Sequence, residues 1–501
     1  MPRTALRVRQ SKRLMAEEEV TMYEGFETKY PVNMNGAKMG KTSIPLLPTA
    51  PYMGGGRLYM QMMSDFAKPV EFTNWRDETL AWHLTCTISA GLNPSPTVII
   101  KGPEAAKFLR EVTVNNIDKW TIGTSKMGII CTDDGNIAAQ GVFMRLSEDE
   151  YLACWLSPYL DFLFRQGCYD ATLEDITEKI CIFQTQGPRS LEMVENAAHE
   201  DLHDIKFCHF RDSTIAGHKV RILRFGMYGC LGYEVHCDTD VAQEVYCSLI
   251  EAGKPLGVRR LGFEAYMMDH TPGGSHQLAF HFVPSIDPRF MQAMADLQAQ
   301  AAAEAKEGNL ADEGHLVSMS LTGSMGEDYA SRMANPIQLG LGRIIDWDKG
   351  DFPGRAALDA YRNSENKRAC ATLVWNADDL GDIYTSQYRD AEPYCPMDWP
   401  GKAWSAIDGG AGIEMDQVLD RNGNVVGISA GRTTDYWHRA MVSLAMIEED
   451  SLADPEGLTV LWGDPGTRQK KVRVTVAPVP FNTHLANRTF GVETIPHPHF
   501  K

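Results

Sequence analysis

Short apolar strand patterns alternate with single helical patterns from about residue 70 onward, and this alternation constrains the fold more than any other feature. TVIIKG at 97–102 predicts a strand, and EAAKFLREVT at 104–113 predicts a helix. Two strands joined at Asp134-Gly135, a hairpin signal, follow in MGIICTDDGNIAAQGVFMRL. The rhythm continues through the strand CIFQTQG at 181–187 and the helix RSLEMVENAA at 189–198. The pattern predicts α+β sheets with their helices on one face.

The pattern changes beyond about residue 365, where strands dominate. ACATLVWNA, QVLDRNGNVVGISAG with its Asn-Gly turn, LTVLWG and KKVRVTVAP are typical of a separate all-β domain, which we expect to be a small barrel. An alanine-rich helix is expected at 290–308. The sequence therefore predicts an irregular N-terminal extension over 1–65, an α+β region of two lobes over 66–364, and a C-terminal β-barrel over 365–501.

Charge and cysteine content limit the partners and the compartment. The net charge of −18 argues against nucleic acid or an anionic membrane as a partner. No apolar run approaches the ~18 residues of a membrane span, and no signal-peptide pattern opens the chain. The 11 cysteines are scattered without a C-x-x-C pair, which is typical of free thiols in a reducing cytosol. We expect a cytoplasmic protein.

Two histidine-containing segments match parts of metal-site patterns. The stretch HEDLH at 199–203 fits H-E-x-x-H, but a zincin needs both imidazoles on one helix face, packed in the core, with a third ligand. Here the segment closes a helix and is polar almost all round. The C-terminal IPHPH at 495–499 sets two imidazoles two residues apart, without a nearby acid or thiol to complete a site. We therefore expect the C-terminal segment to be a solvated tail, and no metal site in this protein.

The stretch RFGMYGCLGYEVH at 224–236 places glycines at 226, 229 and 232 between two strands. A dinucleotide loop requires G-x-G-x-x-G at the start of a helix, so this pattern does not predict one. A backbone turn that approaches a flat ligand, followed by Glu234 on a short strand, is one interpretation. The residues alone leave open a second one, in which Glu234 is a surface residue of a glycine-rich hairpin.

Several stretches together resemble the aminomethyltransferase (glycine-cleavage T-protein) superfamily of tetrahydrofolate enzymes over about 80–501. They are FQTQGPRS at 183–190, LRFGMYGCLGYEVH at 223–236, PIQLGLGRIIDWDKGDFPGRAAL at 336–358 and GNVVGISAG at 423–431. Within it, EFTNWRDETLAWH at 71–83, GFEAYM at 262–267 and APVPF at 477–481 are similar to the aromatic O-demethylases of the vanillate and syringate type. The resemblance implies a ring of three domains with folate in the central channel and the barrel as the third domain.

The resemblance also implies roles for individual residues. Glu234 matches the carboxylate that binds the pterin, whose adjacent amine and ring N–H a carboxylate accepts as a pair. Gln186 either hydrogen-bonds the pteridine or is a strand-end turn residue. Tyr266 matches the catalytic tyrosine of the O-demethylases, where a phenol suits a departing phenolate because their pKa values are similar; a structural aromatic is its alternative. Asp269 and His270 follow it without an assigned role.

The chain departs from its relatives at positions that set the substrate. GNIAAQG lacks the acidic residue of the T-protein, which argues against glycine cleavage. Asn93 stands where vanillate-type enzymes carry histidines, and Leu156 stands where an arginine pairs with the substrate carboxylate, with Trp155 as an apolar wall. Because a buried carboxylate without a cationic partner is unfavourable, we expect an uncharged aromatic substrate.

We therefore expect a tetrahydrofolate-dependent transferase that moves a methyl or methylene group from a small aromatic ether to tetrahydrofolate, as a monomer or homodimer. A non-catalytic folate-binding accessory protein of the iron–sulfur maintenance type is an alternative. That group carries K-G-C-[YF]-x-G-Q, and QGCYDA at 166–171 lacks its Gly-Gln and lies upstream of the glycine hairpin. A sulfonium-ether or glycine-type demethylase is the remaining alternative.

Overall fold

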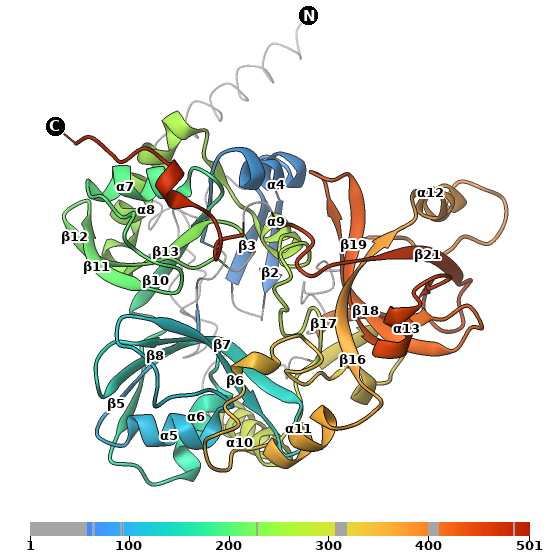
Figure 1. The fold of residues 1–501 in the computed structure, drawn as a ribbon, viewed down its shortest axis with the longest axis horizontal. Coiled ribbons are helices and arrows are strands. Elements are labelled where there is room, and N and C mark those ends of the chain that lie inside the picture. Colours follow the sequence, from blue (N-terminus) through green and yellow to red (C-terminus); the bar gives the residue numbers. More distant parts are fainter. Residues whose placement is uncertain are drawn as a thin grey trace, which may run out of the picture.

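The computed structural model describes residues 58–62, 66–90, 93, 95–226, 229–305, 318–398, 410–483 and 486–500. Most of the predicted extension over 1–65 lies outside these residues. Three parts that each contain a β-sheet surround the centre of the molecule, and Figure 1 shows them as a ring. The prediction of an α+β fold with a C-terminal barrel is confirmed. None of the helices in the described part of the chain is long and apolar enough to cross a membrane.

The first lobe is built on a six-stranded sheet. Its order is β11 (Phe210–Ile215), β12 (His218–Leu223), β13 (Gly232–Asp238), β10 (Ile180–Gln186), β4 (Thr87–Ser89) and β14 (Arg259–Arg260). The helices α7 (Ser190–Ala198) and α8 (Ala242–Gly253) pack on this sheet through apolar residues such as Leu191, Val245 and Leu249. The predicted helix at 189–198 and strand at 181–187 are confirmed.

The second lobe has a five-stranded sheet in the order β6 (Ser125–Cys131), β7 (Ile137–Arg145), β8 (Glu150–Cys154), β5 (Thr97–Lys101) and β9 (Thr172–Asp175). The helices α5 (Ala105–Val112) and α6 (Tyr159–Gln166) bury their apolar sides against it. The predicted hairpin between β6 and β7 is confirmed. Gly135 takes the left-handed φ of 81° at the turn, and Oδ1 of Asp134 accepts the backbone N–H of Asn136 at 2.9 Å.

The third part is a closed barrel. Its strands follow the order β17 (Gly410–Leu419), β18 (Val425–Asp435), β19 (Ala440–Glu448), β16 (Arg368–Trp375), β21 (Lys470–Ala477) and β20 (Thr459–Trp462), and β20 pairs again with β17. A further strand, β15 (Ser318–Thr322), pairs in parallel with β17 although it precedes residue 365. The alanine-rich helix is present as α10 (Pro288–Ala305).

Shorter elements connect these three parts. The hairpin of β2 (Leu58–Met62) and β3 (Phe66–Glu71) is followed by α4 (Trp75–Leu84), and α9 (Phe263–Met268) lies against β3, α4 and β18. The helices α12 (Ala377–Ser386) and α13 (Glu449–Ala453) flank the barrel strands. The helix α11 (Arg355–Arg362) lies beside the second lobe, where its Leu358 is buried with Ile129 and Ile137. Figure 1 shows α4 at the upper edge of the ring and α9 below it, between the first lobe and the barrel.

The C-terminal segment returns to the first lobe instead of staying with the barrel. Val492 and Ile495 are buried in the same apolar cluster as α7 and α8. The guanidinium of Arg224 donates to the carbonyl oxygens of Asn487 and Phe490 at 3.0 and 3.1 Å. The last residues of the predicted barrel span are therefore part of the first lobe, because that is where their apolar side chains leave water.

Candidate active site

Glu234 lies in the interior of the first sheet. On β13 it stands directly opposite Gln184 of β10 and Leu223 of β12, and it is only 4% exposed. Gln184 Nε2 donates to Oε1 of Glu234 at 2.8 Å, and Nε2 of His236 lies 3.0 Å from Oε2. The structure therefore excludes the interpretation of Glu234 as a surface glutamate. A buried carboxylate with polar neighbours on both oxygens is a fixed, oriented acceptor.

Gln186 belongs to the same buried network. Its Nε2 donates to Oε1 of Gln184 at 3.1 Å, and the thiol of Cys230 donates to its Oε1 at 3.4 Å. The indole N–H of Trp82 in turn donates to the sulfur of Cys230. Gln186 is 1% exposed and lies beside the Glu234 pair, and its part in pterin binding stays a prediction.

This network retains hydrogen-bonding capacity for a ligand. A carboxylate has about four acceptor positions, and the described contacts of Glu234 use two of them. Nδ1 of His236 is buried without a hydrogen-bond partner among the described residues. An unused donor or acceptor in the interior is costly unless a ligand or water meets it. The arrangement fits a flat ring that carries several adjacent polar groups.

The glycines that precede Glu234 have a different role from the one expected. A Cβ at Gly232 would lie 3.0 Å from the carbonyl oxygen of Thr185, and a Cβ at Gly229 would lie 2.9 Å from that of Gly273. Gly229 also has a left-handed φ of 69°. These glycines therefore let β13 and its approach pack against other segments of the backbone. The contacts that require glycine here are within the protein.

Tyr266 is buried on α9, the helix that packs against β3, α4 and β18. Glu78 of α4, which is fully buried, accepts the backbone N–H of Gly262 just before α9 at 2.7 Å and the N–H of Phe72 at the end of β3 at 2.7 Å. This carboxylate joins the stretches 71–83 and 262–267, which lie far apart in the sequence. The ring of Tyr266 meets His270 edge to face at 5.1 Å between centroids.

Trp155 shares an apolar cluster with Tyr266, whereas Leu156 does not. Trp155 packs against the cluster that contains Tyr266, Leu223 and Phe280. It has a left-handed φ of 65°, and its indole nitrogen is buried without a hydrogen-bond partner in the described part of the chain. Such a backbone conformation in a bulky residue is strained and is found at functional sites. The structure thus places Trp155 against the same apolar cluster as Tyr266.

Leu156 and Asn93 occupy other surroundings. Leu156 is 1% exposed within the core of the second lobe, with Phe143 and Leu160. The side chain of Asn93 bridges the backbone of Ile182, donating to its carbonyl at 2.7 Å and accepting its N–H at 2.9 Å. Neither contact places these side chains beside Tyr266, and their part in substrate selection stays a prediction.

A buried carboxyl group at Asp269, to which the sequence analysis assigns no role, adds to the site. Asp269 is 2% exposed, and its Oδ2 has no partner among the described residues. Burial raises its pKa well above the usual range, and the negative charges of Asp435 and Glu78 raise it further. The carboxyl therefore favours its protonated form. The sequence alone does not predict this raised pKa, because Asp435 comes from the barrel.

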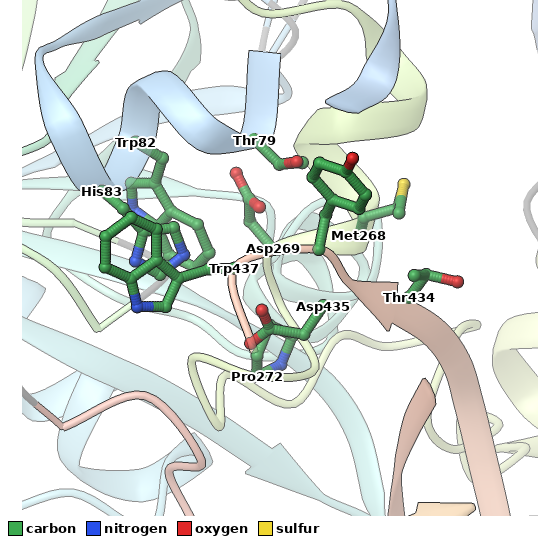
Figure 2. A pocket seen from close by; sticks show the side chains of 10 residues that line it. Thr79, Trp82, His83, Met268, Asp269, Pro272, Thr434, Asp435 and Trp437 are labelled. Carbon is green, nitrogen blue, oxygen red and sulfur yellow. The ribbon is translucent and has the colours of Figure 1, made fainter. Parts of the chain in front are cut away.

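Asp269 lines a small cavity between α4, α9 and the end of β18, shown in Figure 2. The cavity measures about 10 Å³, which is room for about one water molecule. His83 and Trp437 stack beside it with ring centroids 4.9 Å apart. His270, which follows Asp269, has its pKa lowered to about 4 by burial, and its Nδ1 lies 2.9 Å from the carbonyl oxygen of Tyr266.

Comparison with known proteins agrees with this geometry. The model of the GCVT N-terminal domain family matches residues 56–270. A sesamin methylene transferase from Sinomonas sp. is 38% identical over 86% of this chain and 94% of its own length. A syringate O-demethylase from Sphingobium sp. is 26% identical over 83% of this chain and 90% of its own length.

A solved structure shows the same fold. The glycine cleavage system aminomethyltransferase T from Bartonella henselae aligns with a TM-score of 0.60 at 14% sequence identity, over 86% of this chain and 96% of that one. The resemblance deduced from the sequence is thereby confirmed. The chain belongs to the GCVT family, as a transferase related to the aromatic O-demethylases and the aminomethyltransferases.

Proposed function

We propose that the protein transfers a one-carbon group from an uncharged aromatic ether to tetrahydrofolate. The observation that carries this proposal is the buried network of Glu234, Gln184, Gln186 and His236 in a chain that is 38% identical to a sesamin methylene transferase. A carboxylate held inside a sheet with acceptor positions to spare suits a ring with adjacent N–H groups.

Glu234 and Gln186 are the residues that would hold the pterin. The unused acceptor positions of Glu234 suit the amine and the ring N–H, and Nδ1 of His236 adds a further polar contact. Tetrahydrofolate, when bound, supplies the amine nitrogens that accept the one-carbon group. The surrounding apolar cluster excludes water, which strengthens every polar contact inside it.

Tyr266 is the residue that would manage the proton on the ether oxygen. A phenolate is a poor leaving group unless it is protonated or hydrogen-bonded as its bond to carbon breaks. A tyrosine hydroxyl is suited to this because it is itself a phenol and can share its proton with the departing phenolate. Since α9 is held at its start by Glu78, the position of Tyr266 is fixed before the substrate binds.

Two ether classes are open to this chemistry, namely methoxyarenes and methylenedioxyarenes. The relative with the higher identity of the two described above is a methylene transferase. A methylenedioxy ring is uncharged, in agreement with the uncharged substrate that the sequence predicts. We therefore favour a methylenedioxyarene as the donor.

The test is an incubation of the purified protein with tetrahydrofolate and a panel of methoxy- and methylenedioxyarenes, each as a neutral compound and as its benzoate. Chromatography of the folate products distinguishes 5,10-methylene- from 5-methyltetrahydrofolate. We expect the methylene product from a neutral methylenedioxyarene, with a catechol as the second product. Folate binding without turnover of any member of the panel would support the accessory-protein alternative and contradict the proposal.

A further inference from the structure

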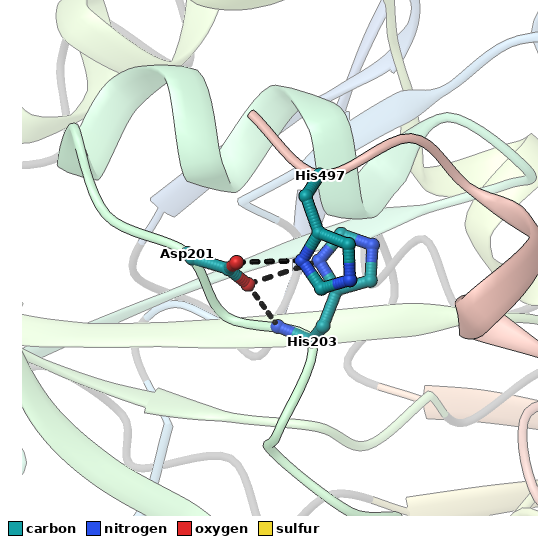
Figure 3. A group of neighbouring side chains, drawn as sticks. All are labelled: Asp201, His203 and His497. Carbon is teal, nitrogen blue, oxygen red and sulfur yellow. Dashed lines mark hydrogen bonds and ion pairs between the residues drawn. The ribbon is translucent and has the colours of Figure 1, made fainter. Parts of the chain in front are cut away.

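The two histidine-containing segments noted in the sequence meet in the folded protein. Figure 3 shows Asp201 and His203 from the stretch 199–203 beside His497 from the C-terminal segment. Nδ1 of His497 lies 2.6 Å from Oδ2 of Asp201, and its ring stacks on that of His203 with centroids 4.0 Å apart. The fold thus supplies the acid that the sequence around the tail lacks, from a position 296 residues earlier.

The ligands that meet here are not those of a zincin. The helix α7 ends at Ala198, and His199 follows with a left-handed φ of 51°. The ring of His199 packs edge to face against Phe500, at 5.6 Å between centroids. His199 and His203 therefore do not share a helix face, and His203 is instead grouped with the tail.

The hydrogen bonds of His203 orient one of its nitrogens toward oxygen ligands. Nε2 lies 3.0 Å from the carbonyl oxygen of Ile495, which can only accept, so this nitrogen carries a hydrogen. Nδ1 lies 2.8 Å from Oε1 of Glu195 and 3.1 Å from Oδ1 of Asp201. A lone pair that faces two carboxylate oxygens is unfavourable unless a positive charge lies between them.

A divalent cation meets this requirement for both imidazoles together. A hydrogen on Nδ1 of His203 toward Glu195, or on Nδ1 of a neutral His497 toward Asp201, serves one ring only. A metal ion bound to Asp201 can be shared by the two rings. The ligand atoms of Asp201, His203 and His497 all lie within 4.8 Å of one another. The side chain of His497 is 61% exposed, so its ring has room to turn toward a shared ion.

We propose that Asp201, His203 and His497 bind a divalent transition metal of the zinc class, with Glu195 beside them as a further carboxylate. Imidazole nitrogens and carboxylate oxygens are ligands of Zn²⁺, and a backbone carbonyl that holds the other imidazole nitrogen is typical of histidine ligands. The site fastens the C-terminal segment to the first lobe, next to the bonds of Arg224 with Asn487 and Phe490. Its role is structural, since none of its residues belongs to the Glu234 network.

The test is a titration of metal-free, untagged protein with Zn²⁺ by calorimetry and with Co²⁺ by visible absorption. His497→Gln removes one ligand, and His499→Gln is the matched control because His499 lies two residues further along the same tail, exposed and outside the cluster. We expect the wild type and H499Q to bind one equivalent, and H497Q to bind at least about tenfold more weakly. Zn²⁺ should also raise the Tm of the wild type and H499Q but not that of H497Q.

Asp201→Asn is a second variant, since it removes a carboxylate while keeping the shape of the side chain. Asp201→Asn should weaken Zn²⁺ binding, as His497→Gln does, and should shift the Co²⁺ absorption spectrum. Zn²⁺ isotherms that coincide for the wild type and H497Q would overturn the proposal. A loss of binding in H499Q equal to that in H497Q would overturn it too, because the tail would then bind metal without this geometry.

Discussion

Gln184 and Glu234 face each other across the β10–β13 pair, and the amide of Gln184 donates to Oε1 of Glu234 at 2.8 Å. The bond fixes one carboxylate oxygen, while His236 contacts the other at 3.0 Å. Glu234 is therefore held in one orientation by its own sheet, and its remaining acceptor positions have a defined direction.

Glu234→Gln should weaken tetrahydrofolate binding, because an acceptor oxygen is replaced by an amide donor that faces the donors of the pterin. We expect a loss of about 1.5–3 kcal/mol, the range for hydrogen bonds to charged groups. Calorimetry measures it directly. Glu251→Gln on the exposed surface of α8 is the control and should bind normally. Wild-type affinity in the Glu234 variant would refute the assignment.

Tyr266→Phe should lower kcat by about 10²–10⁴-fold, the usual contribution of general acid–base catalysis, and should leave tetrahydrofolate binding nearly unchanged. The variant removes only the hydroxyl and keeps the ring that packs against His270. Tyr388→Phe, at a side chain that is 90% exposed, is the matched control. Steady-state kinetics with the neutral arene that the wild type turns over fastest measures kcat for both variants. A kcat equal to that of the control would assign Tyr266 a structural role.

Neutral aromatic ethers should exceed the corresponding benzoates as one-carbon donors. A carboxylate desolvated without a cationic partner costs a few kcal/mol, which corresponds to roughly two or more decades in kcat/KM. The measurement compares pairs of substrates that differ only in the carboxylate. Leu156→Arg is an unsuitable test, because position 156 lies in an apolar core and a charge there would destabilise the lobe. Faster turnover of vanillate or syringate than of every neutral arene would contradict the prediction.

Turnover should not require a metal ion. The proposed site at Asp201, His203 and His497 shares no residue with the Glu234 network, so dialysis against a chelator should lower the Tm and leave kcat within about twofold. Activity and melting are measured on the same dialysed sample. If dialysis abolished turnover and Zn²⁺ restored it, the metal would be catalytic and the separation of the two sites would be wrong.

Asp416 should give the barrel a stability that depends on pH. It is 3% exposed, and burial together with the negative charge of Glu414 raises its pKa to about 7. In the unfolded chain an aspartate titrates near ~3.9, so between about pH 4 and 7 the folded protein holds a proton that the unfolded chain has lost. The contribution of Asp416 to the free energy of unfolding is therefore fully present below about pH 4 and falls as the pH rises to about 7. Above about pH 7 this contribution no longer changes with pH.

Asp416→Asn removes this titration. The variant keeps an acceptor oxygen for the backbone N–H of Ser324, which donates to Oδ1 of Asp416 at 2.9 Å in the wild type. Relative to the wild type, the variant should gain up to about 4 kcal/mol in free energy of unfolding between pH 4 and 7, at about 1.4 kcal/mol for each pKa unit. Urea denaturation at pH 4, 5.5 and 7.5 measures the difference. Parallel stability curves for the two proteins would show that Asp416 does not titrate in this range.

Local patterns in the sequence were enough to predict the elements and the family. The hairpin at Asp134-Gly135 needs only a turn signal between two apolar runs, and the helix over 288–305 needs only its composition. The strand that carries Glu234 follows from alternation, and its role was inferred by resemblance from the residues around it. Each of these properties depends on neighbours within a few positions, so the order of residues by itself determines it.

The tertiary structure alone decided which side chains meet. Gln184 reaches Glu234 through the register of β10 and β13. Burial raises the pKa of Asp269, and the negative charge of Asp435 from the barrel raises it further. His497 finds Asp201 only because the apolar residues of the tail bury against the first lobe. Burial, pKa and metal-ligand geometry depend on distances between groups that are far apart in the chain, and these distances are fixed only when the cores pack.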